Sequence, residues 1–235
     1  MDESQILILT AASIAFLHTI LGPDHYLVFV AMGKARNWTL ARTLRVTFGC
    51  GLGHVLSSVV IGAVGIWLGA ELTRLVAIET GRGTLAGWAL LAFGLVYTVW
   101  GLRHAYRNRR HSHLHAHGDI VHSHEHDHHG EHAHVHLEHS RSGITPWAIF
   151  IIFVLGPCEA LIPLFMYPAA QQNAGLVIAV AVVFGVVTLA TMLAAVTLGT
   201  LGLKQLKLPR LERYAHAIAG ASIVACGSAI NFAGL

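Results

Sequence analysis

The stretch FLHTILGPDH, residues 16–25, decides how this chain folds, because it places two histidines and an aspartate inside a long apolar run. The run extends from Ile6 to Met32, and about 20 apolar residues suffice for a helix to cross a hydrocarbon core roughly 30 Å thick. An Asp at the centre of such a helix costs roughly 2.5–3.5 kcal/mol on insertion scales, so an ionisable residue there is a candidate functional residue. The stretch therefore predicts a membrane helix that carries a polar site.

Apolar runs of this kind make up most of the sequence. Hydrophobic residues are 54% of the 235 residues and charged residues only 11%, less than half of the roughly 25% typical of soluble domains. Further helices are expected at Leu44–Leu68, Thr84–Leu102, Trp147–Tyr167, Ala174–Leu201 and Tyr214–Phe232. The composition predicts an all-α polytopic membrane protein with six transmembrane helices in contact with the lipid bilayer. It excludes a soluble enzyme, and we expect no enzymatic activity.

Positive charge is concentrated in alternate connections between these helices. Of the 15 Lys and Arg residues, only Arg74 and Arg82 lie in the second connection and none in the fourth. Because cytoplasmic loops carry the excess of Lys and Arg, the first, third and fifth connections are expected in the cytoplasm and both termini outside. The expected location is the inner membrane of a bacterium or archaeon. The basic residues form no patch, so nucleic acid is not expected as a partner.

The third connection divides the chain into two halves. Residues 104–145 form a histidine-rich cytoplasmic loop between a first half, 1–103, and a second half, 146–235. The sequence LGPDH at 21–25 has an echo in LGPCE at 155–159, and three helices per half give the halves opposite orientations. Helices broken by glycine and proline at matching places are typical of inverted-repeat transporters, which hold the substrate near the midplane. We therefore predict a 3+3 inverted repeat.

The loop itself is predicted to be disordered without metal and to bind several metal ions weakly. Alternating histidine on a polar segment offers many exchangeable imidazole ligands and cannot build a packed core. A linker that responds to pH is the alternative. The candidate loop ligands are His111, His113, His115, His117, His122, His124, His126, His128, His129, His132, His134, His136 and His139.

A metal site is predicted inside the membrane. Its candidate ligands are His18, Asp24, His25, His54 and Glu159, with Cys50 and Cys158 as further candidates. Pro23 removes a backbone donor and Gly22 lets the chain unwind, so a break there can bring His18 towards Asp24 and His25. Alternating glycines before His54 allow another helix to approach closely. The alternative is a proline-kinked helix whose polar groups only hydrogen-bond to neighbouring helices.

Imidazole and carboxylate ligands suit Ni, Co, Zn and related first-row cations. We therefore predict a transporter of divalent transition-metal cations, with the metal ion as substrate and no organic cofactor. Efflux is favoured over import, with Glu159 as the proton carrier of a proton-coupled cycle. The oligomeric state is left open, a homodimer included.

Three other functions remain as alternatives. The stretch Gly156-Pro157-Cys158 suits a membrane thiol–disulfide electron carrier. Such a carrier needs a partner thiol at the matching position of the first half, which is occupied by Asp24. Cys50 is the cysteine that could replace this partner. An exporter of sulfite-like anions needs Lys or Arg at the helix centres, where the predicted helices have none. A metal sensor without transport is the third.

The pattern of His18, five residues, Asp24-His25 and then Met32-Gly33 resembles the first-helix signature of the hydrogenase and urease accessory nickel permeases. Six helices with a histidine-rich central loop are similar to the nickel/cobalt efflux proteins. The resemblance implies nickel or cobalt as the substrate and His18, Asp24 and His25 as metal-site residues. The stretch at 156–159 is not part of that signature and resembles the Gly-Pro-Cys helices of membrane thiol electron carriers.

Overall fold

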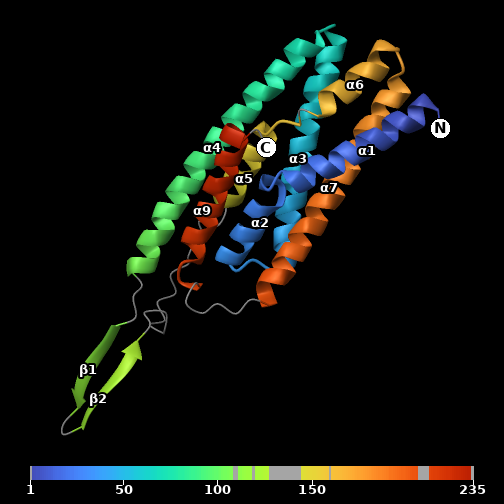
Figure 1. The fold of residues 1–235 in the computed structure, drawn as a ribbon. Coiled ribbons are helices and arrows are strands. Elements are labelled where there is room, and N and C mark those ends of the chain that lie inside the picture. The colour runs from blue at the N-terminus through green and yellow to red at the C-terminus, as the bar shows by residue number, and fades with distance from the viewer. Residues whose placement is uncertain are drawn as a thin grey trace.

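The computed structural model describes residues 2–107, 111–117, 120–126, 144–158, 160–205 and 212–233. Its helices are α1 (Glu3–Leu21), α2 (Asp24–Ala35), α3 (Leu40–Trp67), α4 (Leu72–Arg107), α5 (Ile144–Leu155), α6 (Leu161–Ala170), α7 (Ala174–Gln205) and α9 (Ala215–Ser228), followed by a π-helical turn at Ala229–Ala233. Strands β1 (His111–His117) and β2 (Ile120–His126) form a hairpin beyond one end of the helical bundle (Figure 1).

Among the described residues, five helical segments are long and apolar enough to cross a membrane. They are Glu3–Leu21, Leu40–Trp67, Leu72–Arg107, Ala174–Gln205 and Ala215–Ala233, and shorter apolar helices lie at Pro146–Leu155 and Leu161–Ala170. Large apolar side chains such as Leu9, Val96 and Leu198 are exposed on the bundle surface. An apolar surface of this extent indicates lipid around it. The predictions of an all-α polytopic membrane protein and of contact with a lipid bilayer are therefore confirmed.

Two of the predicted membrane helices are interrupted. The first, Ile6–Met32, consists of α1 and α2, which meet at Gly22 and Pro23. The fourth, Trp147–Tyr167, consists of α5 and α6. Proline lacks the N–H that a helix interior requires and is tolerated at the start of a helix, so each Gly-Pro pair ends one helix before the next begins. The break expected near Pro23 is confirmed.

Helix α4 differs from its prediction, since it begins at Leu72 instead of Thr84 and continues to Arg107. Glu79 and Arg82 therefore lie inside a membrane-length helix and not in a connection. The charged residues of this first part lower the local hydropathy, which is why the apolar run alone does not reveal it. Opposite charges three residues apart lie on one face of a helix and are compatible with its continuation.

Helices of the two halves pack against each other throughout the bundle. α1 packs against α7, α5 against α3, and α4 against α9. Glycines make the last contact close, because a Cβ at Gly94 would lie 2.7 Å from the backbone nitrogen of Val224 and one at Gly227 would lie 2.7 Å from that of Leu91. Small residues let helix backbones approach in this way in membranes. The two halves therefore form one bundle.

The hairpin occupies part of the histidine-rich loop, where the sequence predicts disorder. β1 and β2 are antiparallel, with His111 opposite His126, His113 opposite His124 and His115 opposite His122. Histidine at every second position has the period of a β-strand, which explains why this stretch is paired. The loop candidates His128, His129, His132, His134, His136 and His139 lie outside the described residues.

Candidate functional site

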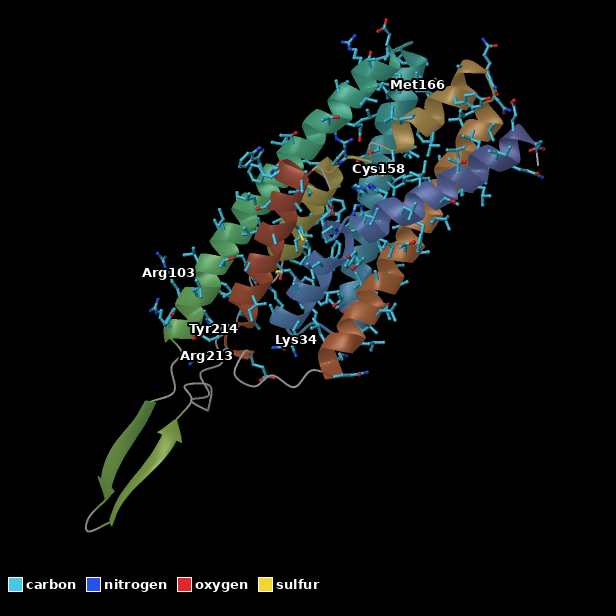
Figure 2. The ribbon with its side chains drawn as sticks, viewed as in Figure 1. Lys34, Arg103, Cys158, Met166, Arg213 and Tyr214 are labelled. Carbon is cyan, nitrogen blue, oxygen red and sulfur yellow. The ribbon has the colours of Figure 1, made fainter. Side chains whose placement is uncertain are left out.

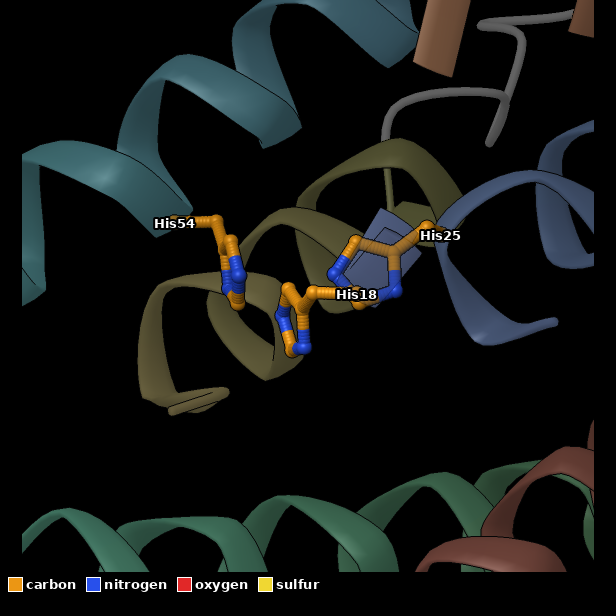
Figure 3. Close-up of side chains that lie close together, drawn as sticks. All are labelled: His18, His25 and His54. Atoms are coloured by element: carbon orange, nitrogen blue, oxygen red, sulfur yellow. The ribbon is translucent and has the colours of Figure 1, made fainter. Parts of the chain in front are cut away.

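Three histidines from three helices meet inside the bundle (Figure 3). His18 lies near the end of α1, His25 at the start of α2 and His54 in α3. The ring centroids of His18 and His25 are 4.8 Å apart, and those of His25 and His54 are 5.2 Å apart. In a continuous helix, seven residues would separate His18 from His25 by about 10 Å along the axis. The break between α1 and α2 is therefore what brings these two rings together.

The orientation of the rings leaves one nitrogen of each unused. Every Nε2 atom of the three is buried and has no hydrogen-bond partner within the described part of the chain. By contrast, Nδ1 of His25 lies 3.2 Å from the Gly22 carbonyl oxygen and 3.2 Å from Oδ1 of Asp24, and Nδ1 of His54 lies 3.2 Å from the Phe153 carbonyl oxygen. An acceptor beside Nδ1 holds the proton there and leaves the Nε2 lone pair available. Because a buried unsatisfied polar atom costs about 1–3 kcal/mol, three of them together indicate a ligand site.

Glycines at both breaks leave room for these rings. A Cβ on Gly22 would lie 2.6 Å from Nδ1 of His25, and a Cβ on Gly156 would lie 3.2 Å from Nδ1 of His54. The His54 ring therefore touches the second break while it lies against His25 of the first. The site is situated where the two breaks approach each other.

The structure brings together only part of the predicted ligand set, namely the three histidines. Asp24 stands beside His25, and its carboxylate orients that ring instead of joining the group of three. Cys50, one turn before His54 on α3, is buried in an apolar cluster with Met192, and Cys158 belongs to a different apolar cluster. Neither sulfur is part of the histidine group. Glu159 lies outside the described residues.

A second polar group surrounds the break between α5 and α6. The carboxylate of Glu79 is fully buried; it accepts hydrogen bonds from the Ser58 hydroxyl at 2.9 Å and from the Cys158 N–H at 3.1 Å. The same N–H lies 3.2 Å from Oγ of Ser58. Figure 2 shows Cys158 in the connection between α5 and α6. Side chains from α3 and α4 thus satisfy a backbone donor that the broken helix leaves without a helical partner.

Arg82 completes this second group. Its guanidinium pairs with the carboxylate of Glu79 and donates to the Ser57 hydroxyl and the Val154 carbonyl oxygen, each at 2.7 Å, and to the Gly156 carbonyl oxygen at 3.4 Å. These carbonyls lie at the C-terminal end of α5, where the last turn of a helix has no partners of its own. A buried ion pair is tolerated when its remaining donors and acceptors are satisfied in this way. Glu79 and Arg82 therefore anchor the second break to α3 and α4.

Sequence reasoning missed Glu79 and Arg82 as site residues. The prediction that Arg82 lies in the second connection is wrong, because this residue lies within α4 and is largely buried against α3 and the end of α5. The signal that can reveal such a pair is the spacing of opposite charges at i and i+3 directly before an apolar run.

The fold and these two polar groups define an integral membrane protein in which two broken helices approach each other inside the bundle, the first carrying imidazoles and the second a buried thiol. A family model described as the cytochrome c biogenesis protein transmembrane region matches residues 26–229. The chain belongs to this family. No curated protein and no solved structure matches the chain.

Family membership corrects the predicted function. The prediction of a nickel or cobalt transporter, and with it the resemblance to the nickel permeases and efflux proteins, is wrong. That resemblance depended on residues 18–33, whereas the family match begins at Tyr26, so His18, Asp24 and His25 precede it. A short motif around one helix break therefore does not determine the family, whereas a match over most of the chain does.

Proposed function

We propose that the protein carries reducing equivalents across the cytoplasmic membrane by thiol–disulfide exchange, in support of cytochrome c biogenesis, with Cys158 as an exchanging thiol. The observation that carries the proposal is the place of Cys158, in the α5–α6 break and within the segment that matches the family. The protein acts as a carrier and not as an enzyme. It passes electrons from a dithiol protein in the cytoplasm to a protein disulfide on the other side.

The surroundings of Cys158 suit a thiol that reacts only after a conformational change. Its side chain is fully buried in an apolar cluster that also contains Ala15 of α1 and Phe184 of α7. The bonds from its N–H to Glu79 and Ser58 hold the break in place. Thiols buried in apolar surroundings are inert. Exchange therefore requires the α5–α6 segment to move.

Cys50 on α3 is the second thiol of the proposed pair. All three cysteines are free in the structure. Cys50 precedes Ser58, the partner of Cys158, by eight residues, which is about 12 Å along a helix, whereas a disulfide needs Cα atoms within about 7 Å. In the proposed cycle this arrangement corresponds to the reduced carrier, and oxidation requires the break to shift along α3.

Electrons and protons balance over the proposed cycle. A cytoplasmic dithiol attacks the Cys50–Cys158 disulfide, and two successive exchanges leave two thiols on the carrier and a disulfide on the donor. On the other side, the two carrier thiols reduce the disulfide of an acceptor protein, and the carrier disulfide forms again. Each cycle moves two electrons and two protons from the donor to the acceptor.

We infer six crossings in two inverted halves, 1–103 and 146–235, with α1–α2 and α5–α6 each counted as one crossing. The helix contacts support this arrangement, because α1 on α7 corresponds to α5 on α3, and α2 on α9 corresponds to α6 on α4. Lys34, Arg103 and Arg213 lie towards the same end of the bundle in Figure 2. The positive-inside rule assigns that end, with the loop at 104–145, to the cytoplasm and both termini to the outside.

Sealed vesicles containing the purified protein test this function. A dithiol protein is added on one side, and a reporter protein with a single reducible disulfide is enclosed on the other. Reporter reduction is expected to require the carrier and to fall to the rate of protein-free vesicles in Cys158→Ser and in Cys50→Ser. Cys226→Ser, which removes another buried cysteine, is expected to keep the full rate. An unchanged rate in Cys158→Ser would contradict the proposal.

A further inference from the structure

We propose that His18, His25 and His54 bind one divalent first-row transition-metal ion through their Nε2 atoms. The ion resides at the α1–α2 break and takes no part in the thiol exchange at the α5–α6 break. The inference goes beyond the proposed function and does not depend on it.

The spacing of the three rings fits a single ion. Zinc–nitrogen bonds are about 2.0–2.1 Å long, so two nitrogen ligands of one tetrahedral ion lie about 3.3 Å apart. One ring nitrogen of each histidine, Nδ1 or Nε2, already lies within 4.8 Å of those of the other two. Rotation of the side chains can bring the three Nε2 atoms to the spacing of one ion, and the helices do not have to move.

The rings are also oriented as metal-bound histidines usually are. A ligating histidine typically donates its other N–H to a carbonyl or a carboxylate, which fixes the tautomer and raises the basicity of the ligand nitrogen. Phe153 supplies a carbonyl to His54, while Gly22 and Asp24 supply a carbonyl and a carboxylate to His25. The carboxylate of Asp24 also offsets part of the positive charge of the ion. Asp24 is thus a positioning residue for His25.

A water molecule is the competing occupant. It donates two hydrogen bonds, so when none of the three Nε2 atoms carries a proton it leaves one of these buried acceptors unpaired. A metal ion accepts all three lone pairs at once. It also leaves a fourth position for a water or another small ligand, as in zinc sites with three protein ligands.

The ligand set restricts the kind of ion. Mg²⁺ and Ca²⁺ prefer oxygen ligands, whereas imidazole suits Zn²⁺, Co²⁺, Fe²⁺ and Cu²⁺. Within the described residues, no cysteine sulfur belongs to the group. The bound ion ties α1 and α2 to α3, so it holds the first break in place while the second break shifts.

Metal retention by the full-length protein tests the site. Because the loop histidines bind weakly, washing with imidazole is expected to strip them and to leave one equivalent of added Zn²⁺ or Co²⁺ on the protein. His18→Gln, His25→Gln and His54→Gln are each expected to weaken retention by tenfold or more. His216→Gln is the matched control, since His216 is engaged by Tyr97 at 2.8 Å and lies outside the group.

Spectroscopy distinguishes a true site from a variant that has lost its fold. Cobalt in the protein is expected to show nitrogen and oxygen neighbours without a thiolate charge-transfer band, and Cys50→Ser is expected to leave the spectrum unchanged. His18→Gln is the deciding variant, because His18 is only partly buried and its replacement leaves the bundle core intact. Retention of the ion by His18→Gln, or a sulfur neighbour, would overturn the proposal. Cys158→Ser is expected to lose electron transfer and keep the ion, so the two proposals fail separately.

Discussion

The two helix breaks of the bundle have the same backbone sequence motif and differ in the side chains around it. Both contain Leu-Gly-Pro, at 21–23 and at 155–157, and in both the glycine lets a histidine ring approach the backbone. After the first break, Asp24 and His25 help to gather three imidazoles. After the second comes Cys158, whose N–H is held by Glu79 and Ser58.

The difference lies in where the polar partners come from. At the first break, two of the three imidazoles belong to the broken helix itself. The sequence around this break therefore supplies most of the candidate ligands. At the second break, the side chains of the described residues that satisfy the backbone come from α3 and α4. We therefore interpret the first break as a fixed binding site and the second as a hinge that a polar network holds closed.

The largest effect is expected from breaking the ion pair that anchors the second break. In Glu79→Gln the charge of Arg82 loses its buried partner, and such a loss typically costs about 3–5 kcal/mol. The free energy of unfolding in detergent measures it. Glu71→Gln, an exposed acidic residue beside the start of α4, is the control and is expected to change it little. If Glu79→Gln lowers the free energy of unfolding no more than Glu71→Gln does, the anchoring role is contradicted.

A smaller effect is expected from filling the space at each break. A Cβ on Gly22 would lie 2.6 Å from the His25 ring, closer than the 3.1 Å between a Cβ on Gly156 and the Phe153 carbonyl oxygen. Overpacking costs about 1–3 kcal/mol, so Gly22→Ala is expected to destabilise more and to weaken metal retention. Gly49→Ala meets nothing within 4 Å and is the control. The reverse order of the two break variants would contradict the comparison.

The hydroxyls of α3 provide a finer test of the second break. Ser58→Ala removes a bond to Glu79 and an acceptor for the Cys158 N–H, and we expect a loss of about 1–2 kcal/mol. Ser57→Ala removes a partly buried contact to Arg82 and is expected to cost less. Thermal unfolding of the two variants compares them directly. Equal losses would mean that the network does not centre on Cys158.

Removing the hairpin is expected to have the smallest effect. Deletion of residues 111–126 removes the hairpin and its histidines, which are predicted to bind metal weakly. Total metal bound before washing is expected to fall, while the retained equivalent, the unfolding temperature and the rate of reporter reduction stay the same. Loss of the retained equivalent would place the strong site in the loop and not at the first break.

The sequence predicts those features that depend on neighbouring residues. Pro23 cannot continue a helix, so the first break is predictable, and the glycines before His54 explain why this ring can reach a partner. Glu79 and Arg82 are not predictable from hydropathy, because their partners Ser58 and Val154 are distant in the chain. A tertiary contact, and not local composition, makes a charged pair acceptable there.

Function is less predictable than the site geometry. The residues from His18 to Gly33 suggest metal transport by their likeness to a short signature, whereas the match over residues 26–229 determines the family. The Gly156-Pro157-Cys158 stretch favours the thiol-carrier alternative, in agreement with the family match. The first half has Asp24 where a partner thiol is expected, and for this reason the sequence alone argues against that alternative. The arrangement of both breaks in one bundle supports the proposal that they serve separate purposes.

In the proposed cycle, Cys158 alternates between a thiol and a disulfide with Cys50. Membranes are held with a reducing dithiol protein or with an oxidised acceptor, quenched in acid, denatured, alkylated and analysed by mass spectrometry. We expect alkylation of both cysteines in the reduced sample, a Cys50–Cys158 linked peptide in the oxidised sample, and alkylated Cys226 in both. Equal alkylation of Cys158 in the two samples would contradict it.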